Sequence, residues 1–311
     1  MDVSSADVGS ARAGDRVCVA ICTCDRHEPL RQALHSLARQ SVGTGLRVIV
    51  VDNGRVSARR VAAEFSDVFD LVYDRVSEPG LTAVRNRSLR LALESGAEFV
   101  ACLDDDERAD DDWLEAHLKA ADRTGADIQI GPIAPVYLAP PPGWIVSGGF
   151  FVEDCESPTT ANLLLRLSCL PEDEADWFQP DYAATGGEDY ELITRLCSQG
   201  ARYGSAAGAR VRDVVPADRL TLRFMLRRGL RDGVYFGTWA RKTHASFAQA
   251  GLVCVGKLCA KLGYAINHLF WSPLAGWRAR RAGVDLASAV GVVIGLCGIK
   301  LRFYGHAARG E

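Results

Sequence analysis

Short apolar runs alternate with segments of helical periodicity between residues 16 and 134, and this alternation restricts the fold more than any other feature of the sequence. The apolar runs, rich in β-branched residues, are 17–22, 47–51, 71–73, 99–103 and 127–130. Between them lie 29–39, 57–65, 81–94 and 111–124, where apolar residues recur three to four positions apart. Strands alternating with helices predict an α/β fold, a parallel sheet with helices on both faces. With 311 residues, 48% of them hydrophobic, the chain can bury such a core.

Polar residues follow three of the predicted strands directly. Thr23 and Asp25 come after the first run, Asp52 after the second, and the acidic run 104–106 after the fourth. Ligands of parallel sheets bind in the crevice beyond the carboxyl ends of the strands. We therefore expect these residues to meet in a ligand site.

The acidic run Asp104, Asp105 and Asp106 ends a strand that is expected to be buried. Because like charges repel, this arrangement is costly unless a cation neutralises it, and aspartate oxygens suit Mg²⁺ or Mn²⁺. Such a cation would bridge to a diphosphate. The alternative is an acidic turn before the next helix, which is our interpretation of residues 110–112. The position at the strand end favours the metal and diphosphate site.

Two further groups of residues could take part in proton transfer or in phosphate binding. Glu188 and Asp189 follow two glycines, at the start of a helix predicted to end near Gly200. Either acid could be a general base, which must reach the proton it removes, although acids at helix starts are as often caps. Arg85 stands early in the helix that follows Gly80, where a cation can face phosphate. A solvated helix face is the alternative.

Several common site patterns are missing from the sequence. It contains no GxxxxGK[ST] phosphate loop, no GxGxxG after a strand and no GxSxG. These absences argue against kinase-like, dinucleotide-binding and serine hydrolase functions. The six histidines also lack zinc-ligand spacing.

An ordered set of motifs spans residues 16–212. The motifs are Val19-Ala-Ile-Cys-Thr-Cys-Asp-Arg, Val48-Ile-Val-Val-Asp-Asn-Gly, Gly80-Leu-Thr-Ala-Val-Arg-Asn, Leu103-Asp-Asp-Asp and Gly187-Glu-Asp-Tyr-Glu-Leu. This set resembles the family 2 glycosyltransferases, which have the GT-A fold. The cysteines of the first motif resemble bacterial transferases of the succinoglycan type, which act on lipid-linked acceptors. Cys24 replaces an aromatic residue that could stack on the base, so the nucleotide is not fixed by this motif.

The resemblance implies an inverting, metal-dependent enzyme that uses a nucleotide sugar, with a UDP-sugar as the expected donor. The implied nucleotide-sugar-binding residues are Thr23 and Asp52 at the base, Asp25 in the same first motif, Arg85 near base or phosphate, and Asp104 and Asp105 at the ribose. Asp106 would hold Mn²⁺ or Mg²⁺, and Asp189 would be the general base, with Glu188 beside it. Processive members carry Gln-x-x-Arg-Trp after the acidic motif. This chain has Met225-Leu-Arg-Arg-Gly there, so a single sugar is expected to be transferred to a hydroxyl of a lipid-linked saccharide or other acceptor.

Two other functions remain open at this point. One is a catalytically inactive protein of the same fold that binds a nucleotide sugar or serves as a scaffold. The other is a nucleotidyltransferase that makes the activated sugar. The second would need a glycine-rich loop with Arg and Lys after the first strand, where this chain has Thr-Cys-Asp-Arg-His-Glu.

The charge changes sharply along the chain. Residues 219–311 hold 15 Lys and Arg against 3 Asp and Glu, a net +12, whereas residues 1–218 hold 21 against 36, a net −15. We therefore expect a flexible leader (1–15), a GT-A domain (16–218) with an acceptor-side segment (135–185), and a basic helical region (219–311).

The basic region also contains two apolar stretches, 252–270 and 282–299. They favour an anionic membrane surface over nucleic acid as the partner. Lys257, Lys261 and Asp285 interrupt them, so amphipathic helices in the interface or a short re-entrant hairpin fit better than a span of about 20 residues. A helical lid whose basic residues are solvated or paired with the acidic part is the alternative. No targeting segment is visible, which predicts a cytoplasmic protein on the inner face of the cell membrane.

Overall fold

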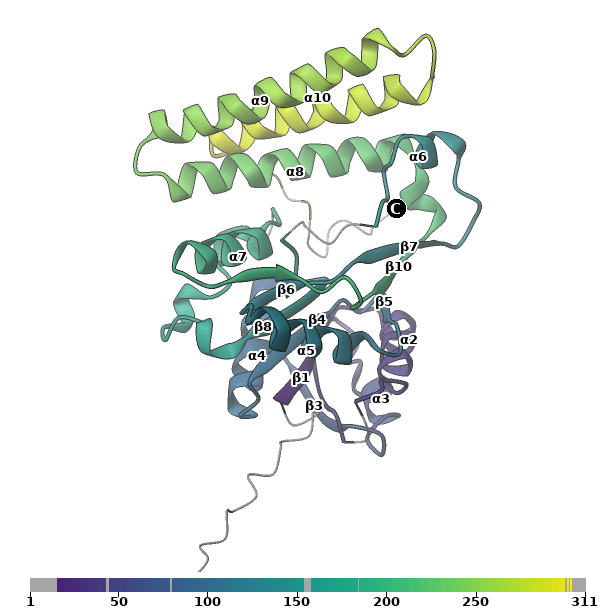
Figure 1. Cartoon of the computed structure of the whole chain (residues 1–311), viewed down its shortest axis with the longest axis vertical. Coiled ribbons are helices and arrows are strands. Elements are labelled where there is room, and N and C mark those ends of the chain that lie inside the picture. The colour runs from purple at the N-terminus through teal and green to yellow at the C-terminus, as the bar shows by residue number, and fades with distance from the viewer. Residues whose placement is uncertain are drawn as a thin grey trace, which may run out of the picture.

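The computed structural model describes residues 16–42, 45–78, 80–153, 158–183, 185–299, 301 and 303. An α/β domain lies beneath a layer of three long helices (Figure 1). The leader expected over residues 1–15 lies outside the described residues.

The central sheet has seven strands in the order β3-β2-β1-β4-β8-β6-β9. From edge to edge these are β3 (Asp70–Arg75), β2 (Arg47–Asp52), β1 (Val17–Thr23), β4 (Phe99–Leu103), β8 (Asn162–Arg166), β6 (Ile128–Ile130) and β9 (Tyr203–Ser205). Neighbours are parallel except at β8, which is antiparallel to both β4 and β6. The predicted α/β fold with a mainly parallel sheet is confirmed. The carboxyl ends of β1, β2 and β4 lie at the same edge, and Thr23 stands directly beside Asp52.

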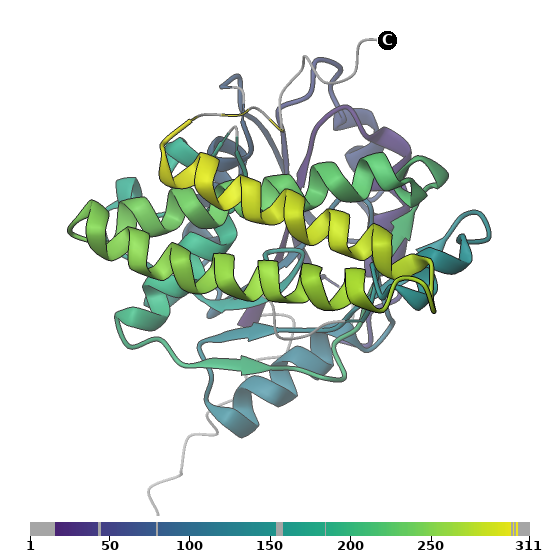
Figure 2. The same cartoon turned by 90° about the horizontal axis from the view of Figure 1, so that it is seen from above.

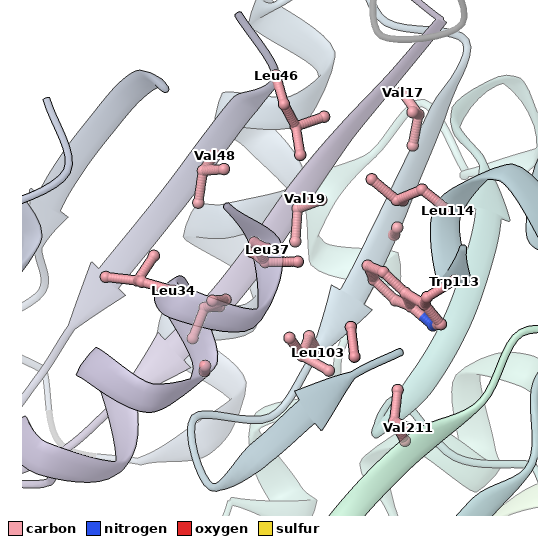
Figure 3. Close-up of a cluster of buried hydrophobic side chains, with 14 of the residues drawn as sticks. Val17, Val19, Leu34, Leu37, Leu46, Val48, Leu103, Trp113, Leu114 and Val211 are labelled. Atoms are coloured by element: carbon pink, nitrogen blue, oxygen red, sulfur yellow. The ribbon is translucent and has the colours of Figure 1, made fainter. Parts of the chain in front are cut away.

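Helices cover both faces of this sheet. On one face pack α2 (His27–Leu37), α3 (Arg59–Ala63) and α5 (Trp113–Thr124), and on the other α4 (Leu81–Glu94) and α7 (Glu188–Ser198). Val17 and Val19 of β1 point into the first core (Figure 3), and the alternate residues Cys18 and Ala20 into the second. Because both faces of β1 are buried, the strand is apolar throughout instead of alternating with polar residues.

The segment 135–185, expected to be irregular with a strand or two, contributes to both sheets of the molecule. It contains most of β7 (Ile133–Tyr137), the short helix α6 (Gly143–Ser147), strand β8 and 3-10 turns at Leu167–Cys169, Glu174–Asp176 and Pro180–Tyr182. Strand β7 pairs with β10 (Val211–Val215), which also pairs with β5 (Glu107–Ala109), to form a second, three-stranded sheet. The sequence did not predict this sheet, because its strands are short and come from distant parts of the chain.

A buried polar network holds the antiparallel strand β8 in the centre of the sheet. Asn162, its first residue, is fully buried. Its Oδ1 accepts from Trp113 Nε1 at 2.8 Å and lies 2.9 Å from His117 Nε2. Its Nδ2 donates to the carbonyls of Pro132 and Ala209 at 3.0 and 2.7 Å. Because buried polar groups are costly unless they are bonded, this network selects one register for the strand.

The C-terminal layer consists of α8 (Leu222–Thr243), α9 (Phe247–Phe270) and α10 (Trp277–Leu296) (Figure 2). Glycines let the backbones of α8 and α10 approach closely. A Cβ added at Gly233 would lie 2.1 Å from the Ser288 carbonyl oxygen, and one at Gly237 would lie 2.2 Å from that of Val292. Small residues where two helices cross permit such a close approach of their backbones, and any larger side chain would force the helices apart.

The apolar stretches predicted in the basic region lie in α9 and α10. Within the part of the chain that the structure describes, no helix is long and apolar enough to span a membrane. Asp285, which interrupts the second stretch, is buried and accepts from Lys261 Nζ at 2.9 Å. This ion pair joins α9 to α10, so the two charges have a structural partner inside the layer.

His117 makes the stability of the fold dependent on pH. Its complete burial lowers the pKa of the imidazole to about 4, although the contact with Asn162 opposes this shift. Between about pH 6.5 and pH 4 the unfolded chain therefore binds more protons than the folded one, and stability falls as the pH falls.

We expect the free energy of unfolding of the wild type to decrease by about 2 kcal/mol more than that of His117→Gln between pH 7 and pH 5. Urea denaturation at the two pH values measures this difference. An identical pH dependence in both proteins would contradict a neutral buried imidazole.

Candidate active site

The structure brings the end of β1 and the acidic run together. Thr23, the last residue of β1, donates through Oγ1 to Asp105 Oδ2 at 2.7 Å. Both side chains are buried. Two of the polar groups expected at the sheet edge, Thr23 after β1 and the acidic run after β4, are therefore in direct contact.

Asp52, at the end of β2, is completely buried and holds the loop that follows it. Its Oδ1 accepts from the Gly54 amide at 2.7 Å, and its Oδ2 from the Ala58 amide and the Tyr73 hydroxyl at 2.8 and 2.6 Å. Both oxygens are thus engaged by the protein itself. A contact of Asp52 with a base remains a prediction and would require one of these bonds to be exchanged.

Asp25 joins the loop after β1 to the loop after β2. Its backbone is in the left-handed region, with φ of 54°, and its Oδ1 accepts from the Val56 amide at 2.9 Å. This backbone donor lowers the pKa of the Asp25 carboxyl. The two loops that would enclose a base are therefore tied to each other, with Asp25 between them.

Two arginines neutralise much of the acidic run. Arg26 Nη1 donates to Asp105 Oδ1 and to Asp106 Oδ2, both at 2.9 Å. Arg219 Nη2, from the 3-10 turn between β10 and α8, donates to the same Asp106 Oδ2 at 3.0 Å. The sequence analysis expected Mg²⁺ or Mn²⁺ to offset the repulsion within this run; in the structure two guanidinium groups pair with it, and the metal ion stays a prediction.

Asp104 lies beside these ion pairs. Its side chain keeps 46% of its surface accessible, yet the enclosing protein raises the pKa of its carboxyl to about 7. The charge of Arg85, 4.0 Å away, opposes this rise, whereas Asp106 and Asp105 add to it. Asp104 is therefore the member of the run whose charge is least compensated by the protein.

The site offers oxygen ligands for a divalent cation, although not a complete cage. No group of three or more His, Cys, Asp or Glu side chains suited to a metal ion occurs among the described residues. Both arginine contacts of Asp106 use Oδ2, and Asp104 has an accessible carboxylate. Mg²⁺ is commonly held by one or two carboxylates together with substrate phosphates, so Asp104 and Asp106 fit such an ion.

The second acidic group lies at the first turn of α7. Gly187 has a φ of 89°, a backbone conformation that favours glycine. A Cβ there would also lie 2.7 Å from Tyr235 Cβ in α8, so the close packing of α8 excludes any side chain. Glu188 is buried, while Asp189 is partly exposed and its Oδ1 accepts from the Tyr190 amide at 2.7 Å. Of the two acids, Asp189 is the more accessible to a second substrate.

Arg85 connects the two acidic groups. Its guanidinium pairs with Glu188 Oε1, lies 4.0 Å from Asp104 Oδ1 and stacks on the Phe178 ring at 5.6 Å. Burial raises the pKa of Glu188 and Arg85 opposes the rise, while Glu188 Oε2 finds no hydrogen-bond partner among the described residues. The sequence placed Arg85 near a base or phosphate. The contact that the structure shows is with Glu188, and the nucleotide contact remains a prediction.

Sequence reasoning missed Arg26 and Arg219 as members of this site. Arg26 was visible within the first motif, next to Asp25, but nothing in the motif indicated its partners. Arg219 opens the basic region, and the opposite charges of the two halves of the chain were the one available signal. Lys242 in α8 pairs with Asp181, which is a second ion pair between the basic region and the acidic part of the chain.

Comparisons with known proteins show relatives of this chain. Residues 18–163 match the model of Glycosyl transferase family 2. Over 299 residues the chain is 29% identical to the succinoglycan biosynthesis protein ExoM of Rhizobium meliloti, with 91% of this chain and 93% of that protein covered. It is 26% identical over 149 residues to a glucosyl-dolichyl phosphate glucuronosyltransferase of Haloferax volcanii, a match that covers 45% of each chain.

Solved structures of TarS from S. aureus share the fold. One gives a TM-score of 0.53 at 13% identity and covers 90% of this chain but 55% of that chain, so this chain spans about half of that protein. A TarS structure of residues 1–349 in complex with UDP gives 0.51 at 14% identity, with 92% and 93% of the two chains covered. The chain therefore contains a glycosyl transferase family 2 domain with a GT-A-like α/β fold and is a glycosyltransferase.

Proposed function

We propose that this chain transfers a single sugar from a nucleotide sugar to a hydroxyl group, with inversion at the anomeric carbon. The observation that carries the proposal is the position of Arg85, which contacts Glu188 and approaches Asp104. One side chain thus spans the distance between the acids suited to a diphosphate and the acids suited to proton removal. A donor and an acceptor bound at these two groups would meet.

The donor would lie along the carboxyl ends of β1, β2 and β4. Thr23, Asp25 and Asp52 shape the two joined loops at the nucleoside end, and Asp104 and Asp105 would contact the ribose. TarS has been solved with UDP and with UDP-GlcNAc, which supports a UDP-sugar as the donor of this chain.

Mn²⁺ or Mg²⁺ would bind at Asp106, with Asp104 as the second carboxylate. The bound ion would stabilise the negative charge that builds up on the departing nucleoside diphosphate. The role of the chain is to hold both carboxylates directly after the buried strand β4, where the ion would reach them.

Asp189 would accept the proton of the acceptor hydroxyl. Its partial exposure allows the contact, whereas Glu188 is engaged by Arg85 inside the protein. The oxygen of the acceptor would attack the anomeric carbon opposite the leaving diphosphate, which inverts that centre. Glu188 would then act through its pair with Arg85, by fixing the first turn of α7.

The acceptor would be a lipid-linked saccharide in polysaccharide biosynthesis. The name of ExoM supports a polysaccharide product, and that of the Haloferax volcanii relative supports a lipid-linked substrate. An enzyme with such an acceptor would work at a membrane surface, on its cytoplasmic side.

The outer face of the C-terminal layer suits that surface. Leu252, Val255 and Ile266 form an exposed stripe along α9, at 75%, 52% and 67% exposure, and Val290 of α10 is exposed as well. The region carries a net charge of +12, which complements anionic headgroups. Apolar side chains on helices rich in Lys and Arg are typical of elements that lie in the interface.

The central experiment is a panel of UDP-, GDP- and dTDP-sugars assayed for Mn²⁺-dependent release of the nucleoside diphosphate, with and without a membrane lipid extract. We expect one UDP-sugar to be hydrolysed slowly and to be consumed faster with the extract. Binding of nucleotide sugars without any turnover would instead support an inactive binding protein.

Asp189→Asn should reduce sugar transfer at least about 100-fold, because general base catalysis contributes that much. UDP affinity in the presence of Mn²⁺ should not change, because the substitution removes no donor contact. Glu115→Gln, which alters an acid in the first turn of α5 on the opposite face of the sheet, is the matched control. Wild-type transfer by Asp189→Asn would rule out this residue as the base.

Asp106→Asn should reduce metal-dependent turnover at least about 100-fold with the fold intact, because the ion supplies several kcal/mol of charge stabilisation. Circular dichroism checks the fold and nucleotide release the activity. Asp110→Asn, whose carboxylate pairs with Arg212 outside the acidic run, is the control and should keep its activity. Full activity of Asp106→Asn would end the metal model.

The full chain should sediment with vesicles that contain phosphatidylglycerol and be released by about 0.5 M salt, because headgroup attraction is screened. Replacing both Leu252 and Ile266 by Glu should weaken this binding. Val68→Glu, at an exposed valine of the α/β domain, should not. If the chain forms a concentration-dependent dimer and does not bind vesicles, the stripe binds a second copy of the chain instead.

A further inference from the structure

Arg219 shares a single carboxylate oxygen with Arg26, and it comes from a different part of the chain. It lies in the 3-10 turn Ala217–Leu220, which links β10 of the second sheet to α8. Both guanidinium groups donate to Asp106 Oδ2, at 2.9 and 3.0 Å. A divalent cation bound by this oxygen would therefore compete with two positive groups.

The two arginines are not equally dependent on Asp106. Arg26 also donates to Asp105 Oδ1 at 2.9 Å, and Asp105 is buried and fixed by Thr23. The other contact of Arg219 is with Asp213 Oδ1 at 3.5 Å, the limit of a hydrogen bond. If Asp106 binds a metal ion, Arg26 keeps its hydrogen bond to Asp105, whereas Arg219 keeps only the long contact with Asp213.

We propose that Arg219 is a donor-binding residue that exchanges its ion pair with Asp106 for an ion pair with the diphosphate of the nucleotide sugar. The proposal rests on the function proposed above. The diphosphate brings new anionic oxygens to the same place, and arginine binds phosphate through two parallel N–H donors. A metal ion at Asp106 repels the guanidinium, and the phosphates attract it.

The place of Arg219 in the chain allows this exchange. Its side chain is 25% exposed, so it is not locked inside the core as Arg85 is at 11%. Two residues later Thr221 caps α8, accepting through Oγ1 from the Phe224 amide at 3.2 Å. The backbone below Arg219 is thus fixed by the cap of α8, and a rotation of the side chain to a new partner requires no change in the helix.

This exchange predicts effects of opposite sign on two affinities of Arg219→Gln. The variant should bind Mn²⁺ alone about threefold or more tightly than the wild type, because a competing positive charge is gone. It should bind UDP in the presence of Mn²⁺ about 10- to 100-fold more weakly, because a charge-assisted hydrogen bond is lost. Uridine, which has no phosphate, should bind equally to both proteins.

Electron paramagnetic resonance of free Mn²⁺ measures the first affinity and titration calorimetry the second. Arg212→Gln is the matched control, because Arg212 lies on the adjoining strand β10 and pairs with Asp110 at 2.6 Å. It should leave both affinities unchanged. Arg219→Lys keeps the charge but loses the planar guanidinium group, so it should show a smaller loss of UDP affinity. This variant replaces Arg219→Gln in the test if Arg219→Gln does not fold.

The outcomes separate this inference from the proposed function. If the wild type binds UDP with Mn²⁺ and Arg219→Gln binds it equally well, Arg219 is a structural residue and the inference alone fails. If both affinities of the variant fall together, Arg219 supports the fold of the site and the exchange is wrong. If the wild type binds neither UDP nor GDP with Mn²⁺, the donor site itself is refuted.

Discussion

Repulsion among the carboxylates at the end of β4 is the constraint around which the site is organised. The strand is buried, so solvent alone cannot screen three adjacent aspartates, and positive groups must come from elsewhere in the chain. Arg26 precedes α2, Arg85 belongs to α4, and Arg219 lies just before α8. Elements from the start, the middle and the end of the chain converge on one strand end for this reason.

Arg85 extends this organisation to the other acidic group. Asn86 makes two hydrogen bonds with the backbone of Phe178, at 3.0 and 2.9 Å, and the Phe178 ring lies against Arg85. The guanidinium is thereby aimed at Glu188, at the first turn of α7. A buried ion pair of this kind contributes little net stability, but the loss of either member leaves a charge without a partner. Its effect is to fix the distance between the acidic run at the end of β4 and the acidic pair at the first turn of α7.

The sequence predicted what depends on local pattern and missed what depends on distant partners. Strand β4 and helix α4 were predicted with the observed ends, because apolar runs and helical periods are local signals. Strand β8 was not located, because its place between β4 and β6 is selected by the contacts of Asn162 with residues far away in the chain. Thr23, Asp52 and the acidic run 104–106 lie together at the carboxyl ends of β1, β2 and β4, and their roles stay predictions. The contacts of Arg85 with Glu188 and of Arg219 with Asp106 were not foreseeable, since in each pair the two residues are more than 100 positions apart in the chain.

The glycine contact between α8 and α10 has a consequence for the order in which the enzyme is completed. Tyr235 of α8 packs on Gly187 beside the acids Glu188 and Asp189, while Gly233 and Gly237 of the same helix lie against the backbone of α10. Helix α10 leaves the ribosome after every segment that carries a candidate catalytic residue. Helix α8, which packs on Gly187, therefore gains its partner helix α10 only when residues 277–296 have been synthesised.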